Sequence, residues 1–314
     1  MIERAPGQRE PGASLLGFVR RFLPVTFGIF LARAGYARLT IMQGDGLPNL
    51  GFLQPVATLT KAPLVEVVTQ FRWGSASRDD AGELVAYVFS DHEKENLFSA
   101  LERVIIDAGF VVVDRFAKEV EDVEFTPARA YRREPGGWPA IQLGLGMLSV
   151  HQDNDGYDWP DYKSEVLAGL DLLTEALGAF YGQPPFIGVE LAYMDAFILG
   201  ESETPYEFLT KNLAVKLVPP RPFFAAPFVS NEPASASLGF DFALSEPNGV
   251  LRLSLEYEEV FGGPGYTMDT RVLSLNPSVG FTRAGMEDWL EAAHRVHQHT
   301  FRTLIEPAYL KSLQ

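Results

Sequence analysis

The sequence contains no cysteine, which excludes disulfides, thiol nucleophiles, iron–sulfur clusters and cysteine-ligated zinc. Basic residues are also scarce, because 26 Lys and Arg stand against 41 Asp and Glu and give a formal net charge of −15. An acidic surface repels the phosphate backbone that supplies most non-specific affinity for nucleic acids. We therefore predict a protein that does not bind nucleic acid.

Long apolar runs are missing as well. A membrane-spanning helix needs about 20 apolar residues, and the apolar run that follows Arg20 and Arg21 ends at Leu31 and is interrupted by Pro24. We predict no membrane span and a cytoplasmic location. The alternative is export, because residues 20–34 have the basic, apolar and small-residue zones of a secretory signal.

The hydrophobic content of 46% over 314 residues is enough for one large or two medium domains. Charge is unevenly distributed: residues 1–60 carry six Arg, no Lys and three acids, whereas the rest of the chain is strongly acidic. We predict that residues 1–58 are an N-terminal extension, either poorly ordered or targeting-like. Residues 59–183 and 184–314 are then predicted to form two α+β halves.

The first half begins with an apolar, β-branched strand that stops at Gly74. A helix over 91–108 follows, because Ser90 and Glu93 have the spacing of a capping box and the apolar residues repeat every three or four positions. The remaining pattern predicts strands over 110–116, 128–133 and 140–152 and a helix over 159–181.

The second half repeats this order, without residue-level identity. It has a strand over 185–199, a short helix that opens at the Thr204–Glu207 capping box, strands over 235–245, 249–260 and 266–275, and a closing helix over 282–305. Each half therefore reads as strand, helix, three strands, helix. This order predicts an α+β fold with an internal duplication, whose antiparallel sheet carries its helices on one face.

Several short motifs occur in the order typical of one protein family. They are Ala62-Pro63-Leu64-Val65-Glu66-Val67, Gln142-Leu143-Gly144 with Leu148-Ser149-Val150, Tyr157-Asp158-Trp159, and His294 seven positions before Phe301. On these motifs residues 60–310 resemble a sporadically distributed family of bacterial proteins of unknown function. The resemblance implies no activity. Its sporadic distribution suggests, by analogy alone, a link to defence or mobile genes.

One segment departs from the family pattern. The family usually carries Arg-Tyr-[Ile/Leu]-Asn in the strand after the central helix, and this chain has Ala192-Tyr193-Met194-Asp195. If the Arg and Asn serve a shared site, this member has lost it.

Two groups of residues are candidates for chemistry. Glu66 interrupts an apolar strand, where a buried carboxylate would act as a general acid or base; alternatively it faces solvent or pairs with Arg72 or Arg133. Glu291 and His294 form a Glu-x-x-His unit, typical of metal ligands, but a second copy is absent and a histidine that packs the helix explains the pattern equally.

Aromatic residues are candidates for binding. Phe223, Phe224 and Phe228 lie in a Pro-rich loop, and Tyr157, Trp159 and Tyr193 are further candidates. We predict a non-enzymatic intracellular binding or assembly protein without a cofactor, whose partner is a protein or a small ligand. The alternative function is a metal-assisted hydrolase that uses Glu66 and His294.

Overall fold

The computed structural model describes residues 63–78, 84–116, 123–181, 186–215, 235–275 and 281–313. The chain divides into two compact units. One comprises Met1–Thr58 and Ser75–Phe89, and the other comprises Leu59–Gly74 and Ser90–Gln314. In the described part of the first unit, β2 (Ser75–Arg78) and β3 (Leu84–Val88) pair as an antiparallel hairpin, which the sequence analysis had missed.

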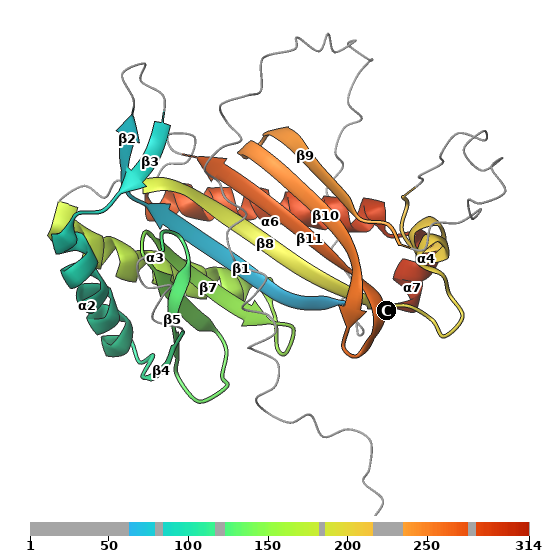
Figure 1. The fold of residues 1–314 in the computed structure, drawn as a ribbon, viewed down its shortest axis with the longest axis horizontal. Helices are drawn as coiled ribbons and strands as arrows, with labels where there is room; N and C mark the ends of the chain where they lie inside the picture. The colour runs from blue at the N-terminus through green and yellow to red at the C-terminus, as the bar shows by residue number, and fades with distance from the viewer. Residues whose placement is uncertain are drawn as a thin grey trace, which may run out of the picture. The chain divides into compact units, whose positions relative to one another are not determined.

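The second unit is built on one antiparallel sheet (Figure 1). In the described part of the chain this sheet has nine strands, in the order β4 (Val112–Arg115), β5 (Pro127–Arg132), β6 (Ala140–Gly144), β7 (Met147–Asp153), β1 (Leu64–Trp73), β8 (Phe186–Ile198), β11 (Gly263–Leu275), β10 (Asn248–Val260) and β9 (Leu238–Ser245). The first described strand, β1, thus lies at the centre, between β7 and β8. The described edges are β4 and β9.

Helices pack on one face of this sheet, which we call the helix face. The described helices of the unit are α2 (Asp91–Asp107), α3 (Trp159–Tyr181), α4 (Pro205–Lys211), α6 (Arg283–Leu304) and α7 (Pro307–Ser312). The Tyr162 hydroxyl of α3 lies 2.9 Å from Thr69 Oγ1 on β1, and Trp289 of α6 donates to Ser274 on β11 at 2.8 Å. Strand alternation places Thr69 and Ser274 on this same face.

The opposite face, which we call the polar face, carries the alternate residues of the same strands. The cross-strand register places Glu66, Gln70 and Arg72 of β1 on this face. The same face carries Met147, Ser149 and His151 of β7 and Glu190 of β8. One face of the sheet is therefore apolar and covered by helices, and the other carries charges and amides.

The sequence predicted most of these elements. Both capping boxes, at Ser90–Glu93 and at Thr204–Glu207, are present with both of their hydrogen bonds. One prediction was wrong: residues 140–152 form two strands, β6 and β7, because the chain turns at Leu145–Gly146, where Gly146 has φ +77°. The described helices include none with the length and hydropathy that a bilayer crossing requires.

Candidate functional site

A cluster of aromatic and histidine side chains lies on the helix face, where α6 crosses β8. Tyr193 of β8 stacks on His297 with ring centroids 3.5 Å apart, and Trp159, at the start of α3, stacks on His294 at 3.9 Å and 5°. Tyr157 meets Tyr193 edge-on at 6.3 Å. These contacts bring together the predicted binding residues Tyr157, Trp159 and Tyr193 with the predicted metal candidate His294.

A chain of hydrogen bonds connects the polar ends of these rings. Gln298 Nε2 contacts His294 Nε2 at 2.8 Å, His294 Nδ1 contacts the Tyr193 hydroxyl at 2.7 Å, and that hydroxyl contacts the Tyr157 hydroxyl at 3.0 Å. One assignment satisfies every group: Gln298 donates to His294, His294 Nδ1 donates to Tyr193, and Tyr193 donates to Tyr157. This assignment requires a neutral imidazole.

The electrostatics of the cluster agree with that assignment. Burial, with a further contribution from His297, lowers the pKa of His294 to about 3. Burial also raises the pKa of the Tyr157 and Tyr193 hydroxyls. The groups are therefore neutral near pH 7, so the cluster acts as a packed junction between sheet and helices.

Glu291, the other predicted metal candidate, anchors the two long helices instead. Its Oε1 accepts from Lys163 Nζ at 2.7 Å and from Trp159 Nε1 at 3.2 Å, so it links α6 to α3. Burial alone would raise the pKa of Glu291, but the bonds from Lys163 and Trp159 lower it overall. The described residues hold no group of three or more His, Asp and Glu placed to bind a metal ion.

Next to the cluster lies a buried polar pair with incomplete hydrogen bonding. Asp195 Oδ2 is 4.0 Å from His297 Nε2, too far for a hydrogen bond, and neither atom has a hydrogen-bond partner within the described ranges. Burial raises the pKa of Asp195, although His297 acts in the opposite direction.

On the polar face, three side chains from β1 and β7 form a continuous relay. His151 Nδ1 lies 2.7 Å from Glu66 Oε1, and His151 Nε2 lies 2.8 Å from Ser149 Oγ. Ser149 and His151 are each 2% exposed, and the Glu66 side chain is 12% exposed. Glu66 therefore lies on the sheet face, as strand alternation suggested, but its partner is His151 rather than Arg72 or Arg133.

A buried arginine lies in the same cross-strand row as His151. Arg132 on β5 pairs with Ala140 on β6, and Ala140 pairs with His151 on β7. The Arg132 guanidinium is 1% exposed, donates through NH1 to Gly137 O at 2.8 Å and stacks over the Trp138 ring at 4.5 Å. Its Nε lies 3.9 Å from Asp114 Oδ2, and its NH2 group is buried with no hydrogen-bond partner in the described part of the chain.

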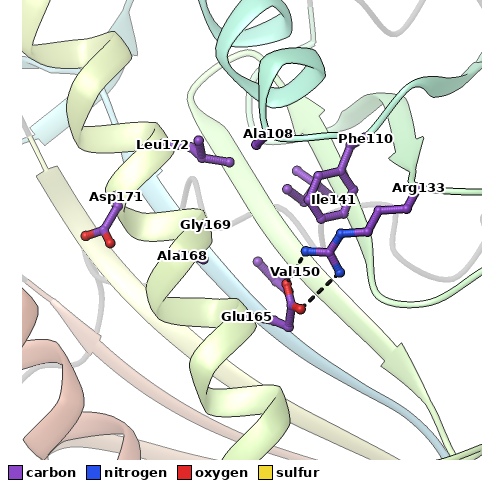
Figure 2. A pocket seen from close by; sticks show the side chains of 10 residues that line it. All are labelled: Ala108, Phe110, Arg133, Ile141, Val150, Glu165, Ala168, Gly169, Asp171 and Leu172. Carbon is purple, nitrogen blue, oxygen red and sulfur yellow. Dashed lines mark hydrogen bonds and ion pairs between the residues drawn. The ribbon is translucent and has the colours of Figure 1, made fainter.

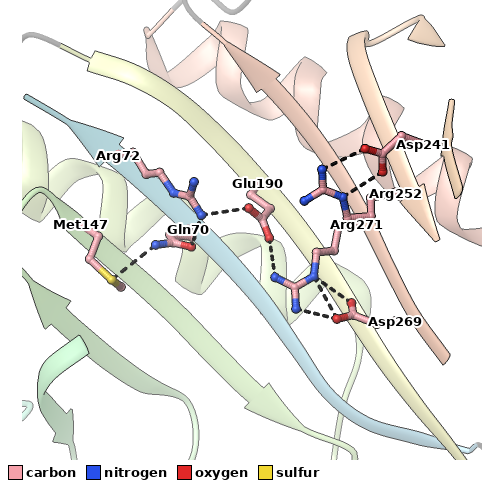
Figure 3. A network of polar contacts seen from close by, with 8 residues as sticks. All are labelled: Gln70, Arg72, Met147, Glu190, Asp241, Arg252, Asp269 and Arg271. Atoms are coloured by element: carbon pink, nitrogen blue, oxygen red, sulfur yellow. Dashed lines mark hydrogen bonds and ion pairs between the residues drawn. The ribbon is translucent and has the colours of Figure 1, made fainter. Parts of the chain in front are cut away.

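An ionic network continues along the polar face towards β9 (Figure 3). The buried Glu190 accepts from Arg72 at 3.1 Å and from Arg271 at 3.0 Å, and Arg271 also binds Asp269. Burial alone would raise the pKa of Glu190, but these two arginines lower it overall. Because these charges compensate one another, we assign this part of the face a structural role.

A small cavity of about 290 Å³ lies on the helix face between α3, the end of α2 and strands β6 and β7 (Figure 2). Its lining is mainly apolar, and its one guanidinium, Arg133, binds both carboxylate oxygens of Glu165 at 3.0 and 2.8 Å and stacks over Phe110. Ligand pockets usually enclose about 300–1,000 Å³. The cavity is therefore small, and its guanidinium is already paired.

The structure separates the two residues of the predicted hydrolase. Glu66 pairs across β8 with Met194 on the polar face, whereas His294 contacts Tyr193 on the helix face. The sheet lies between them, so they form no common site. Phe223, Phe224 and Phe228 lie outside the described residues.

No motif in the sequence points to Ser149, His151 or Arg132 as functional residues. Ser149 and His151 are two residues apart on one strand, a spacing that could have drawn attention to them, but the partner Glu66 comes from another strand. Comparison with known proteins found no match among protein-family models, curated proteins or solved structures.

Proposed function

We propose that the protein is a binding or assembly protein that associates with a second copy of itself through the edge strand β9. The single observation that supports this proposal is an exposed apolar edge. Phe240 and Phe242 are 45% and 48% exposed, and their rings stack with centroids 5.9 Å apart. They project on the helix face, beside Leu253 and Leu251 of β10.

The two described edges of the sheet differ in a way that favours this role for β9. Edge strands expose unpaired backbone groups, and proteins usually protect them by shortness, charge or proline. β4 has four residues and ends in the exposed Asp114 and Arg115, so it is protected. β9 has eight residues, contains neither Lys nor Pro, and its one charge, Asp241, is bound to Arg252 at 2.8 and 2.9 Å.

The sequence of β9 is compatible with antiparallel pairing to itself. Centred on Phe242, the pairing places Asp241 opposite Ala243 and Phe240 opposite Leu244 of the second copy. Like charges are then kept apart, and the apolar side chains form one row across the interface. A register centred on Asp241 would place two carboxylates opposite each other, which is unfavourable.

We also propose that the unit consists of two similar halves related by an approximate two-fold axis between β1 and β8. In support, strands β1, β7, β6 and β5 run outward on one side, and β8, β11, β10 and β9 run outward on the other. Among the described elements, and in sequence order, each set has one helix between its first and second strands and one after its last strand; these are α2 and α3 in the first set and α4 and α6 in the second. In this scheme β4 is an addition to the first half, and β5 corresponds to β9.

The experiment is sedimentation equilibrium of the full chain and two matched variants. Phe242→Lys places a charge at the centre of the proposed interface, where two lysines would face each other. Phe261→Lys makes the same change at a Phe that is 65% exposed in the β10–β11 turn. We expect dimers for the wild type and Phe261→Lys and monomers for Phe242→Lys. A monomeric wild type, or a dimeric Phe242→Lys, would refute the proposal.

A further inference from the structure

We propose that the polar face carries an acyl-transfer site in which Ser149 is the nucleophile, His151 is the general base and Glu66 is the residue that positions His151. This inference goes beyond assembly, because the site lies within one subunit and does not involve β9. It is carried by the Ser149–His151–Glu66 relay and by the NH2 group of Arg132 in the same row, which has no hydrogen-bond partner among the described residues.

The hydrogen bonds of the relay have the direction that nucleophilic catalysis requires. When Glu66 Oε1 accepts from His151 Nδ1 at 2.7 Å, the lone pair of the neutral imidazole is at Nε2. That nitrogen lies 2.8 Å from Ser149 Oγ and can accept its proton. This constellation is recognised by geometry and roles rather than by chain order or fold.

The reaction needs only water besides the ester substrate. Ser149 Oγ bonds to the acyl carbon while its proton moves to His151 Nε2. The bond from that carbon to the leaving oxygen then breaks, and His151 returns the proton to the alcohol. Water attacks the acyl-serine, His151 takes one proton of the water, and its return to Oγ releases the acid and regenerates the site.

The sheet also provides a donor for the oxyanion. Backbone N–H groups in the middle of the sheet already donate to neighbouring strands. The hydrogen-bond donor to the oxyanion must therefore be a side chain. Gln142 on β6 lies directly opposite Ser149 and projects on the same face. Its amide is a neutral N–H donor next to the nucleophile, a type of group that stabilises tetrahedral intermediates in acyl transfer.

Arg132 indicates the class of substrate. Its buried NH2 group has no hydrogen-bond acceptor among the residues that the structure describes, and the small side chain of Ala140 separates it from His151. Two strand spacings, about 10 Å, separate the backbones of β5 and β7. A short acyl ester with a carboxylate at the far end of its acyl chain would span from Ser149 to Arg132. The site is therefore assigned to small anionic esters.

The first test is covalent labelling of the full-length protein with diisopropyl fluorophosphate, a small probe suited to a serine that is 2% exposed. Intact mass and peptide mapping locate the adduct. Ser254 is the matched control, because it lies on the same face of β10. We expect one adduct at Ser149, its loss in Ser149→Ala, its retention in Ser254→Ala, and labelling at least about 100-fold slower in Glu66→Gln.

The second test compares two p-nitrophenyl esters of equal chain length, the succinate monoester and the butyrate. We expect at least about tenfold faster cleavage of the succinate monoester, and loss of this preference in Arg132→Gln. Circular dichroism checks that Arg132→Gln is folded; if it is not, the wild-type ratio of the two rates decides alone. Absence of a Ser149 adduct, or unchanged cleavage by Ser149→Ala, overturns the site. Equal wild-type rates overturn the substrate class.

Discussion

Trp159 and His294 stack with ring centroids 3.9 Å apart and ring planes within 5° of parallel. The stack joins the first turn of α3 to the middle of α6, and Glu291 reinforces it by accepting from Trp159 Nε1. The two long helices of the helix face are thus fixed to each other as well as to the sheet. We regard this junction as structural, because its groups are neutral or paired.

Trp159→Ala should lower the free energy of unfolding by about 3 kcal/mol, because it removes the stack and the bond to Glu291 together. Trp159→Phe keeps an aromatic ring on His294 and should cost about 1 kcal/mol, the value of the lost hydrogen bond. Urea denaturation of both variants measures the difference. Equal losses for the two variants would show that the stack contributes nothing beyond the hydrogen bond.

His294 should make stability depend on pH. Its pKa in the folded protein, about 3, lies below the ordinary value of 6.5, so folding disfavours the protonated ring. Its contribution is complete above pH 6.5 and is lost as the pH falls from 6.5 towards 3, by up to about 1.4 kcal/mol per pH unit. Urea denaturation between pH 7 and pH 4 should show a shallower decline for His294→Gln, and NMR should show a neutral imidazole at pH 5. A ring that titrates near pH 6.5 would contradict this account.

Asp195→Asn should stabilise the protein at pH 7 by about 1 kcal/mol, since it removes a buried carboxylate whose Oδ2 has no partner. The folded pKa of Asp195 is raised, so the charged form costs stability as the pH rises above the ordinary value of 3.8. The advantage of the variant should therefore shrink as the pH falls towards that value. Urea denaturation at pH 7 and pH 4.5 measures both effects. A destabilised variant at pH 7 would mean that Asp195 has a partner.

Glu190→Gln should destabilise the protein by about 2 kcal/mol or more at pH 7, because Arg72 and Arg271 would lose their shared carboxylate in a buried site. The folded pKa of Glu190 is lowered, so its contribution is present above the ordinary value of 4.5 and is lost as the pH falls below it. Asp241→Asn is the control, because the Asp241–Arg252 pair is exposed and should contribute less than about 1 kcal/mol. Equal costs in urea denaturation at pH 7 would contradict the burial argument.

Local signals in the sequence were sufficient for most helices. Ser90 with Glu93, and Thr204 with Glu207, mark helix starts because each capping box involves only four consecutive residues. The hairpin within residues 140–152 was missed for a physical reason. Nearly all of these side chains are buried, on both faces of the sheet. The segment therefore reads as one continuous apolar run, and no alternation of polar and apolar residues marks where the first strand ends and the second begins.

The polar relay could not be derived from the sequence. Glu66 and His151 are 85 positions apart, and only the register between β1 and β7 brings them together. Strand alternation could turn Glu66 to one face of the sheet but could not identify its neighbour. The aromatic junction could not be derived from the sequence either. Tyr157, Trp159 and Tyr193 were predicted as separate binding residues, and only the crossing of α6 over β8 brings them together.

Disulfide trapping tests the central claim, self-association through β9, most directly, because the chain has no cysteine of its own. In the proposed register Phe242 faces Phe242 of the second copy, and directly opposed residues of antiparallel strands have Cα atoms about 4.5–5.5 Å apart, within disulfide range. Phe242→Cys should therefore give a covalent dimer on mild oxidation, whereas Phe261→Cys should stay monomeric on a non-reducing gel. A monomeric Phe242→Cys protein, or equal cross-linking of both variants, would contradict the account.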